Sequence, residues 1–232
     1  MKSLAVEKVL KAKANKLKAQ LLSKFFKTGK GEYGEGDVFL GITVPEQRLI
    51  AKEFVNIPLE EVQKLLQSPL HECRFTALLI LTYKYSKADE KEKNKIFDFY
   101  IKNTKYINNW DLVDVTCHKI VGEYLFEKDR KILYKLAKSK NLWEKRIAII
   151  STFYFIRERD FSDSIKIAEM LLGDTHDLIH KAVGWMLREV GKKDENVLHD
   201  FLKIHTKKMP RTALRYAIER LPEEFRRFYM RL

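Results

Sequence analysis

The sequence of 232 residues is poor in cysteine, and it has no long hydrophobic run. The two cysteines, Cys73 and Cys117, lie inside helical apolar patterns without CxxC spacing, which favours a reducing compartment and no metal site. The most apolar run, residues 147–156, is too short to span a bilayer. Residues 1–30 are dense in lysine and lack the apolar stretch of a signal peptide. We therefore expect a cytoplasmic protein that does not act on membranes.

The short motifs of several enzyme classes are also missing. We find neither GxxxxGK[ST] nor a strand followed by GxGxxG, so the sequence offers no cradle for a nucleotide. The six histidines show no HxxxH or HExxH spacing, and no serine sits in a nucleophile elbow. We expect no cofactor and no metal, and we interpret His118 and His180 as helix-surface or core residues.

The charge that is present is strongly basic and unevenly placed. The net charge is +13, of which residues 1–30 carry +8 and residues 203–232 carry +6, so the middle of the chain is close to neutral. Like charge gathered at both ends of a compact fold suggests a surface for a polyanion, driven by phosphate neutralisation and counterion release. The alternative is a pair of solvated, lysine-rich ends that aid solubility.

Apolar residues recur at helical spacing along almost the whole chain, and no stretch alternates long enough to form a sheet. We predict an amphipathic helix over 3–27, followed by a loop in which five of the nine glycines cluster at 29, 31, 34, 36 and 41. That first helix is expected to place one apolar face against the core: Leu10, Leu17, Leu21, Phe25 and Phe26. Further helices are predicted at 44–54, 59–67, 70–85, 88–103, 109–126, 129–139, 142–157, 161–172, 176–191, 194–206, 210–220 and 222–231, with breaks marked by Pro58, Pro69, Gly173, Gly191, Pro210 and Pro222.

The stronger helices start near 70, 109, 142 and 176, and each is followed by a second helix. These starts are 33–39 residues apart, a spacing typical of the paired-helix repeats of HEAT proteins. The sequence therefore predicts an all-α fold, a right-handed superhelical solenoid of antiparallel helix pairs with a concave basic face. Its length suits one extended domain or two small ones, and we favour a single domain over 1–232.

Two acids in the predicted 109–126 helix have different explanations. Asn108 or Asn109 can cap the helix, and Asp111 in its first turn is favoured by the helix dipole and points toward solvent. Asp114 lies past that turn, within about 40° of Trp110 at the border of the apolar stripe. An ordinary ion pair with a neighbouring helix would explain Asp114, whereas helix formation alone does not.

Two later helices also carry a charged group among apolar residues. Arg146 follows an expected capping box of Asn141 and Glu144, and it suits either an ion pair with Asp114 or a phosphate contact. In the second helix, Trp185 and Arg188 share a face. Core packing would explain the tryptophan, and the arginine could snorkel.

Glycine inside that second helix is costly, and basic residues follow near the C-terminus. Gly184 weakens a helix by about 1 kcal/mol relative to alanine, so something is expected to approach its backbone closely. Arg211 and Arg215 in the 210–220 helix fit a clamp on a nucleic-acid backbone. Solvated surface charge is the plain alternative.

Four ordered motifs make the sequence resemble the AlkD family of DNA alkylation-repair glycosylases over about residues 20–220. They are Phe39-Leu40-Gly41-Ile42-x-x-Pro45-x-x-Arg48, Asn109-Trp110-Asp111-x-Val113-Asp114, Asn141-x-Trp143-x-x-Arg146-x-Ala148 and Gly184-Trp185-x-Leu187-Arg188-Glu189. Members are HEAT-like helical solenoids that excise cationic N3- and N7-alkylated purines. Some branches of the family lack the three active-site residues, a tryptophan, an aspartate and an arginine, and are inactive. The Lys-rich first helix and the Gly-rich 29–36 loop are not family signatures.

The resemblance implies an active-site trio and a set of DNA contacts. Trp110, Asp114 and Arg146 would form the trio, with Trp185 as a second aromatic contact. The further expected DNA contacts are Arg188, Arg211, Arg215, Thr43 and Arg48. It also implies capture of double-stranded DNA without a base pocket. A curved solenoid that embraces a duplex could act as a monomer.

The expected chemistry agrees with these residue types. An alkylated purine is already a cationic leaving group, so a carboxylate such as Asp114 need only stabilise the oxocarbenium-like sugar and orient water. The alternative reading is a non-catalytic HEAT-repeat scaffold that binds nucleic acid or protein.

Overall fold

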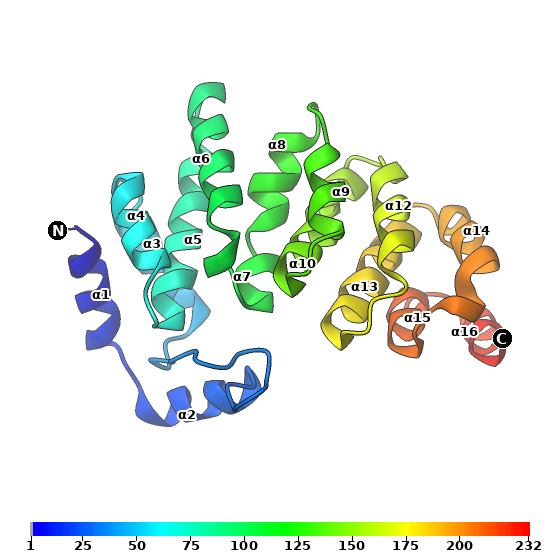
Figure 1. Cartoon of the computed structure of the whole chain (residues 1–232), viewed down its shortest axis with the longest axis horizontal. Helices are drawn as coiled ribbons and strands as arrows, with labels where there is room; N and C mark the ends of the chain where they lie inside the picture. Colours follow the sequence, from blue (N-terminus) through cyan, green and yellow to red (C-terminus); the bar gives the residue numbers. More distant parts are fainter. Residues whose placement is uncertain (1) are drawn as a thin grey trace. The chain divides into compact units, whose positions relative to one another are not determined.

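A computed structural model describes residues 2–232, which fold mostly into helices (Figure 1). Among them the β-type pairing is an isolated parallel bridge between Val38 and Leu70, so the predicted all-α class is confirmed. The chain forms two compact units, the first ending at Thr116 and the second beginning at Cys117. The single domain and the concave basic face stay predictions. No helix within residues 2–232 is long and apolar enough to cross a membrane.

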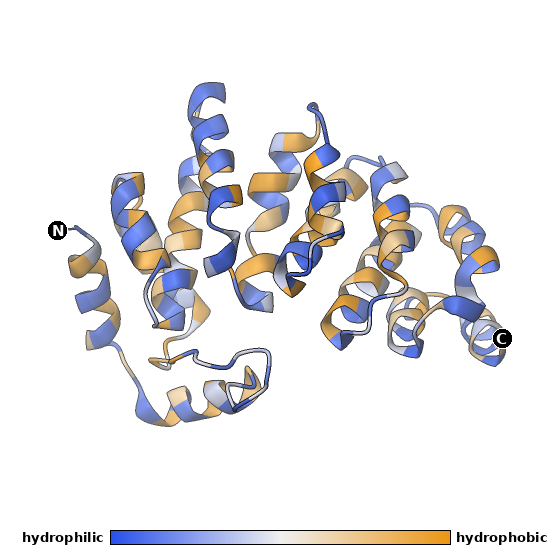
Figure 2. Ribbon diagram, in the orientation of Figure 1, coloured by the Kyte–Doolittle hydropathy of each residue, from blue (hydrophilic) through white to orange (hydrophobic). Residues whose placement is uncertain are grey.

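The first unit contains seven α-helices in its described residues and a short 3₁₀ turn. Its elements are α1 (Lys2–Ala12), α2 (Lys16–Phe25), α3 (Val44–Glu53), α4 (Leu59–Leu66), α5 (His71–Tyr85), α6 (Glu90–Lys102), η1 (Thr104–Tyr106) and α7 (Trp110–Asp114). The helix α5 is buried along most of its length and packs against α3 and α4, because its sequence is apolar on nearly every face. Figure 2 shows the contrast with α6, whose first half is hydrophilic.

The predicted 3–27 helix is wrong in two respects. It is interrupted after α1, because the Asn15 side chain accepts a hydrogen bond from the Lys18 amide (3.0 Å) and so starts α2 as a new helix. The expected core face is also not maintained. Leu17, Leu21 and Phe25 are 75%, 67% and 63% exposed, whereas Leu10 on α1 and Phe26 just after α2 are buried.

The second unit continues as helix after helix. Its elements are η2 (a π-helix, His118–Gly122), α8 (Glu123–Leu125), α9 (Lys131–Ala137), α10 (Leu142–Ser151), α11 (Phe153–Arg157), α12 (Ser162–Leu171), α13 (Asp177–Lys193), α14 (Glu195–His205), η3 (Thr206–Lys208), α15 (Arg211–Ile218) and α16 (Glu223–Arg231). Prolines mark several starts as predicted, since Pro210 and Pro222 precede α15 and α16.

Three predicted boundaries differ from the structure. The 109–126 helix is not regular, because it stops at Asp114 and resumes as the π-helical turn η2. The 142–157 helix is divided at Thr152, whose hydroxyl donates to the Ile149 carbonyl (2.7 Å). Gly191 does not end its helix. The helix α13 runs on to Lys193, and the Asp194 carboxylate caps α14 by accepting from the Asn196 amide (3.0 Å).

Candidate functional site

The short helix α7 carries Trp110 at its first residue and Asp114 at its last. The Asn109 side-chain oxygen accepts a hydrogen bond from the Trp110 amide (2.8 Å), so the predicted cap is confirmed. Trp110 is half-buried, and its ring stacks on Phe26 with centroids 5.0 Å apart and planes 12° apart. Phe25 meets the same indole edge-on at 5.9 Å. Asp114 is half-buried, as its place at the border of the apolar stripe predicts.

Asp111 does not point to solvent, so that expectation is wrong. Its carboxylate is 13% exposed and lies 2.8 Å from Nε2 of His71, the first residue of α5. The helix is only five residues long, and the packing of α7 against α5 turns its first turn inward. A rotation angle taken from a long regular helix therefore misplaces this side chain.

His71 belongs to a buried charge cluster that the sequence interpretation missed. Its Nδ1 lies 3.1 Å from the Asp37 carboxylate, which also accepts from the Asn109 amide group (3.1 Å) and from the Arg74 guanidinium. Burial lowers the pKa of His71, but the carboxylates of Asp111 and Asp37 outweigh it and raise the pKa to about 9. Burial acts to raise the pKa of Asp37, yet His71 and Arg74 bring it below its ordinary value.

One sequence signal could have found this cluster. His71 and Arg74 are one helical turn apart at the start of a strongly apolar helix, where charged groups require partners. Asp37 is harder to find, because it lies in the irregular segment after the glycine-rich loop. Nothing in the local sequence pairs a residue near 37 with residues near 71 and 111.

In the second unit, Arg146 is 5% exposed and lies on α10. Its guanidinium donates to the Leu178 carbonyl in the first turn of α13. The Asn141 side chain accepts from the Trp143 amide (2.8 Å), which confirms the cap of α10. The predicted capping box of Asn141 and Glu144 is wrong in its second bond, because the Asn141 backbone N–H donates to the Ser139 hydroxyl oxygen (3.0 Å), and that hydroxyl donates to Glu144.

Trp185 is half-buried on α13, with its ring 6.0 Å from that of Phe153 on α11. The close approach expected at Gly184 is confirmed, but another helix makes it. A β-carbon at Gly184 would lie 2.4 Å from the Ala213 carbonyl oxygen and 2.5 Å from the β-carbon of Tyr216, both on α15. Gly184 therefore lets α13 and α15 pack backbone to backbone beside Trp185.

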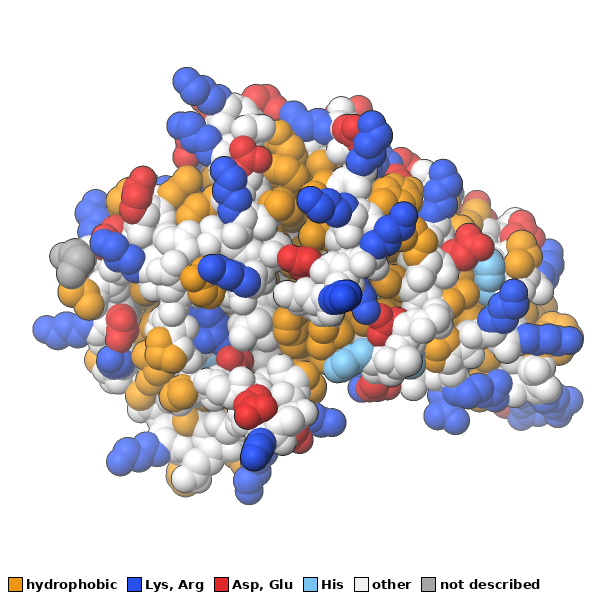
Figure 3. Space-filling view, in the orientation of Figure 1, with side chains coloured by type: hydrophobic (Ala, Val, Ile, Leu, Met, Phe, Trp, Pro, Cys, Tyr) orange, Lys and Arg blue, Asp and Glu red, His pale blue; other side chains and the backbone are white. Residues whose placement is uncertain are grey.

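The remaining predicted DNA contacts differ in the bonds that their side chains form within the protein. Arg188 forms ion pairs with Glu219 and with Glu189 (3.6 Å). Arg211 donates to the Met230 carbonyl (2.6 Å), and Arg215 is exposed on the same helix. On the drawn face, Lys and Arg side chains gather over α15 and α16 at the lower edge of the second unit (Figure 3).

Thr43 and Arg48 lie at the start and in the middle of α3. Both are exposed, as a contact to DNA requires. Glu46 accepts from the Thr43 amide (3.1 Å) and hydroxyl (2.6 Å), which confirms the predicted capping box. The same bonds, led by the hydroxyl, lower the pKa of Glu46.

The model of the DNA alkylation repair enzyme family matches residues 6–221, nearly the whole chain. The chain belongs to this family. Its membership agrees with the resemblance of the four motifs and supports a role in DNA repair.

Solved structures of similar fold include two bacterial relatives. A predicted DNA alkylation repair enzyme from Enterococcus faecalis is 18% identical with a TM-score of 0.69, covering 90% of this chain and 97% of its own. AlkD2 from Streptococcus mutans is 19% identical with a TM-score of 0.54, covering 88% of this chain and 98% of its own. At these identities the likeness concerns the fold. A comparison with curated proteins finds no match.

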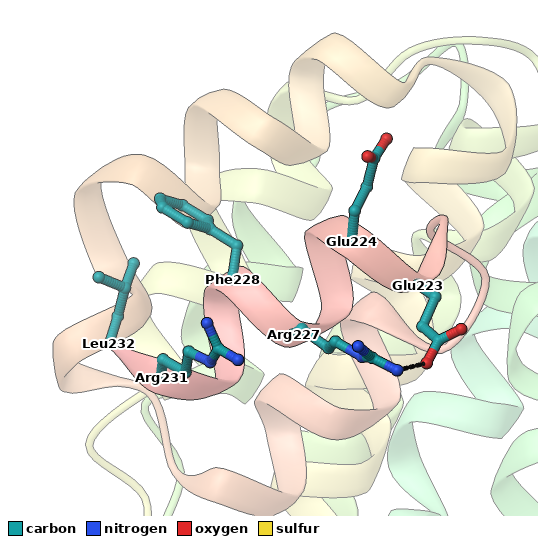
Figure 4. A pocket seen from close by; sticks show the side chains of 6 residues that line it. All are labelled: Glu223, Glu224, Arg227, Phe228, Arg231 and Leu232. Atoms are coloured by element: carbon teal, nitrogen blue, oxygen red, sulfur yellow. Dashed lines mark hydrogen bonds and ion pairs between the residues drawn. The ribbon is translucent and has the colours of Figure 1, made fainter.

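No group of three or more His, Cys, Asp or Glu side chains among residues 2–232 is placed to hold a metal. His118 is half-buried, and burial, Lys119 and Arg157 lower its pKa to about 4. Nε2 of the half-buried His180 lies 2.5 Å from the Asp174 carbonyl. The depression in Figure 4 lies along α16 and its end, and it is lined by Glu223, Glu224, Arg227, Phe228, Arg231 and Leu232.

Proposed function

We propose that the protein is a DNA glycosylase of base excision repair, acting on cationic N3- and N7-alkylated purines in duplex DNA. One observation carries the proposal. A family model of DNA alkylation repair enzymes spans residues 6–221, and within that span α7 presents a half-buried carboxylate, Asp114, one turn from an accessible tryptophan, Trp110. The basic ends of the chain supply the charge that a duplex requires.

The proposed reaction breaks the bond between the sugar and the alkylated base. Alkylation makes the purine cationic, so the base leaves as a neutral molecule without a strong general acid. The deoxyribose then gains positive charge, which an anionic side chain stabilises while it orients the attacking water. We assign this role to Asp114. Partial burial strengthens such an interaction, because less solvent screens the carboxylate.

The aromatic and cationic residues would serve as binding groups. Trp110 and Trp185 are both half-buried and retain accessible surface, so each can offer a ring face to positive charge. A cation–π contact contributes about 0.5–2 kcal/mol. Arg146 would contact a phosphate beside the lesion, and a guanidinium already held by the Leu178 carbonyl is a preorganised donor for that contact.

The test is release of N7-methylguanine or N3-methyladenine from a defined duplex, with protein in excess. Asp114→Asn keeps the shape of the side chain and removes its charge, so we expect a loss of about 100- to 1,000-fold in the rate of base release with binding retained. Asp98→Asn is the matched control. It removes the same charge from the exposed face of the neighbouring helix α6 and should leave the rate unchanged.

Two results would count against the glycosylase. If the wild-type protein binds alkylated duplex but frees no base, the scaffold reading replaces it. If Asp114→Asn and Asp98→Asn slow release equally, the effect is one of net charge, and Asp114 has no special role.

A further inference from the structure

The buried cluster of Asp37, His71, Arg74 and Asp111 lies outside the trio, yet it contacts the helix that carries it. The four side chains come from three segments: the end of the glycine-rich loop, the start of α5 and the start of α7. Asp37 and His71 have side chains only 3% exposed, and Arg74 is 6% exposed. Groups this deeply buried must satisfy one another, because water cannot.

Hydrogen-bond geometry fixes the protonation of His71. Each ring nitrogen faces a carboxylate oxygen, Asp37 at 3.1 Å from Nδ1 and Asp111 at 2.8 Å from Nε2. Ionised carboxylates only accept, so both nitrogens donate and the ring is an imidazolium. The raised pKa of His71, about 9, agrees with this assignment. With two carboxylates, one guanidinium and one imidazolium, the cluster is neutral overall.

Few other charged groups surround the imidazolium. Glu72 on α5 is occupied by the backbone amides of Leu40 (2.9 Å), Gly41 (2.8 Å) and Ile42 (3.3 Å). Lys18 on α2 lines the same cavity of about 250 Å³ as His71, Glu72 and Asp111. The ring therefore owes its charge chiefly to Asp37 and Asp111, and the Arg74 guanidinium opposes it.

The same histidine packs in a group of aromatic rings that reaches Trp110, and it contacts Phe26 directly, with centroids 5.1 Å apart. His71 stacks on Phe39 with centroids 4.4 Å apart, and Phe39 stacks on Phe26 at 5.0 Å. Phe26 in turn stacks on Trp110 at 5.0 Å. Two routes thus run from His71 to the start of α7, one through the ion pair with Asp111 and one through the aromatic rings to Trp110.

We propose that His71, as an imidazolium shared by Asp37 and Asp111, is a positioning residue that fixes Trp110 and the first turn of α7, and through that turn Asp114. The effect on base release depends on the proposed function. The effect on Trp110 does not. The segment just after the glycine-rich loop also gains a role, since it carries Asp37 to the charge cluster and Phe39 to the aromatic rings.

The first test observes Trp110 in the full chain without DNA. The protein is labelled with 5-fluorotryptophan, and its three tryptophans, Trp110, Trp143 and Trp185, are assigned through single Trp→Phe variants. Between about pH 6 and 10, we expect the ¹⁹F resonance of Trp110 to shift with a midpoint of about 9, where His71 loses its proton. Trp143 and Trp185 belong to the second unit and serve as internal references.

Two variants separate positioning from folding. His71→Gln removes the titrating ring, and Asp111→Asn keeps the shape of the side chain but removes the carboxylate that requires a charged partner. His71→Gln should abolish the Trp110 transition, and Asp111→Asn should move its midpoint to lower pH, because the ring then keeps only the Asp37 carboxylate. Both should slow single-turnover base release by about 10- to 100-fold, with binding of the duplex little changed. The limb of the wild-type pH–rate profile above about pH 9 should disappear in His71→Gln and should move to lower pH in Asp111→Asn.

The matched control is His199→Gln. His199 in the second unit also uses both ring nitrogens, toward the Tyr229 hydroxyl (2.7 Å) and the Glu195 carboxylate (3.1 Å). It should reduce stability without moving the Trp110 resonance or the rate. A Trp110 resonance that is constant with pH, or that titrates equally in His71→Gln, overturns the proposal. Absence of base release from the wild type would instead overturn the glycosylase and leave the fluorine result to decide the positioning role.

Discussion

Replacing Gly184 by alanine tests whether the contact between α13 and α15 holds Trp185 in place. An added β-carbon would lie 2.4 Å from the Ala213 carbonyl oxygen and 2.5 Å from the β-carbon of Tyr216. Neither atom is the tip of a flexible side chain, so the backbones of two packed helices must separate. Separation displaces the turn that carries Trp185, the neighbouring residue.

The magnitude is a difference between two opposing effects. Alanine is better than glycine within a helix by about 1 kcal/mol. Overpacking a close contact costs about 1–3 kcal/mol, and a clash with a backbone carbonyl belongs near the upper end. We therefore expect Gly184→Ala to lower the free energy of unfolding by about 2 kcal/mol. For a chain of this size that lowers the melting temperature by about 4–8 °C.

Calorimetry and urea denaturation measure the change, with Gly173→Ala as the control. Apart from Gly173 and its two chain neighbours, no described residue comes within 4 Å of a β-carbon at Gly173, so its replacement should be neutral or should stabilise by up to about 1 kcal/mol. Base release by Gly184→Ala should fall because Trp185 moves. A Gly184→Ala protein as stable as the wild type would refute the reasoning, since α13 and α15 would then tolerate a side chain between them.

Three further outcomes follow from the charged groups. Because folding raises the pKa of His71 from 6.5 to about 9, its contribution to stability is complete below pH 6.5 and is lost as pH rises through 9. The free energy of unfolding, measured by urea denaturation, should fall by about 3 kcal/mol in total as His71 loses its proton. His71→Gln should remove this dependence of stability on pH. Glu72→Gln should cost about 1–3 kcal/mol in the same assay, because an amide oxygen cannot satisfy three backbone amides as a carboxylate does. Arg215→Ala should reduce the slope of log binding constant against log salt by about 0.9 if it contacts one phosphate, whereas Lys131→Ala on α9, away from the basic ends, should not.

Periodicity and caps predict most helices correctly, because both are local. Thr43 with Glu46, Asn109 and Asn141 each cap a helix where the sequence places them. The 3–27 helix fails for a reason that is also local, since Asn15 caps α2 and interrupts it. The exposure of Leu17 on α2 is different, because periodicity identifies an apolar face but not whether another element covers it.

The candidate site could be predicted only in part. Trp110 and Asp114 are one turn apart in sequence, so local geometry places both on α7. The environment of Asp111 could not be predicted, because its partner His71 is 40 residues away and Asp37 is 34 residues beyond that. Pairing over such separations depends on how helices pack, and a single sequence contains no local signal for it.

Stability alone does not explain why this cluster is ionic. Desolvation of four charged groups offsets most of their mutual attraction, and well-packed apolar residues would serve the core of the first unit at least as well. Apolar contacts do not require a particular orientation of the groups that make them, whereas hydrogen bonds do. The His71 ring must present its two N–H groups to Asp37 and Asp111, and this requirement fixes the orientation of α7 more narrowly than packing does. A site whose carboxylate must meet a reacting sugar at a defined distance benefits from such a constraint. Replacing His71 and Asp111 together by Gln and Asn keeps the Asp37–Arg74 ion pair, so it should cost less stability than His71→Gln alone, which leaves the Asp111 carboxylate without its partner, and it should still slow base release.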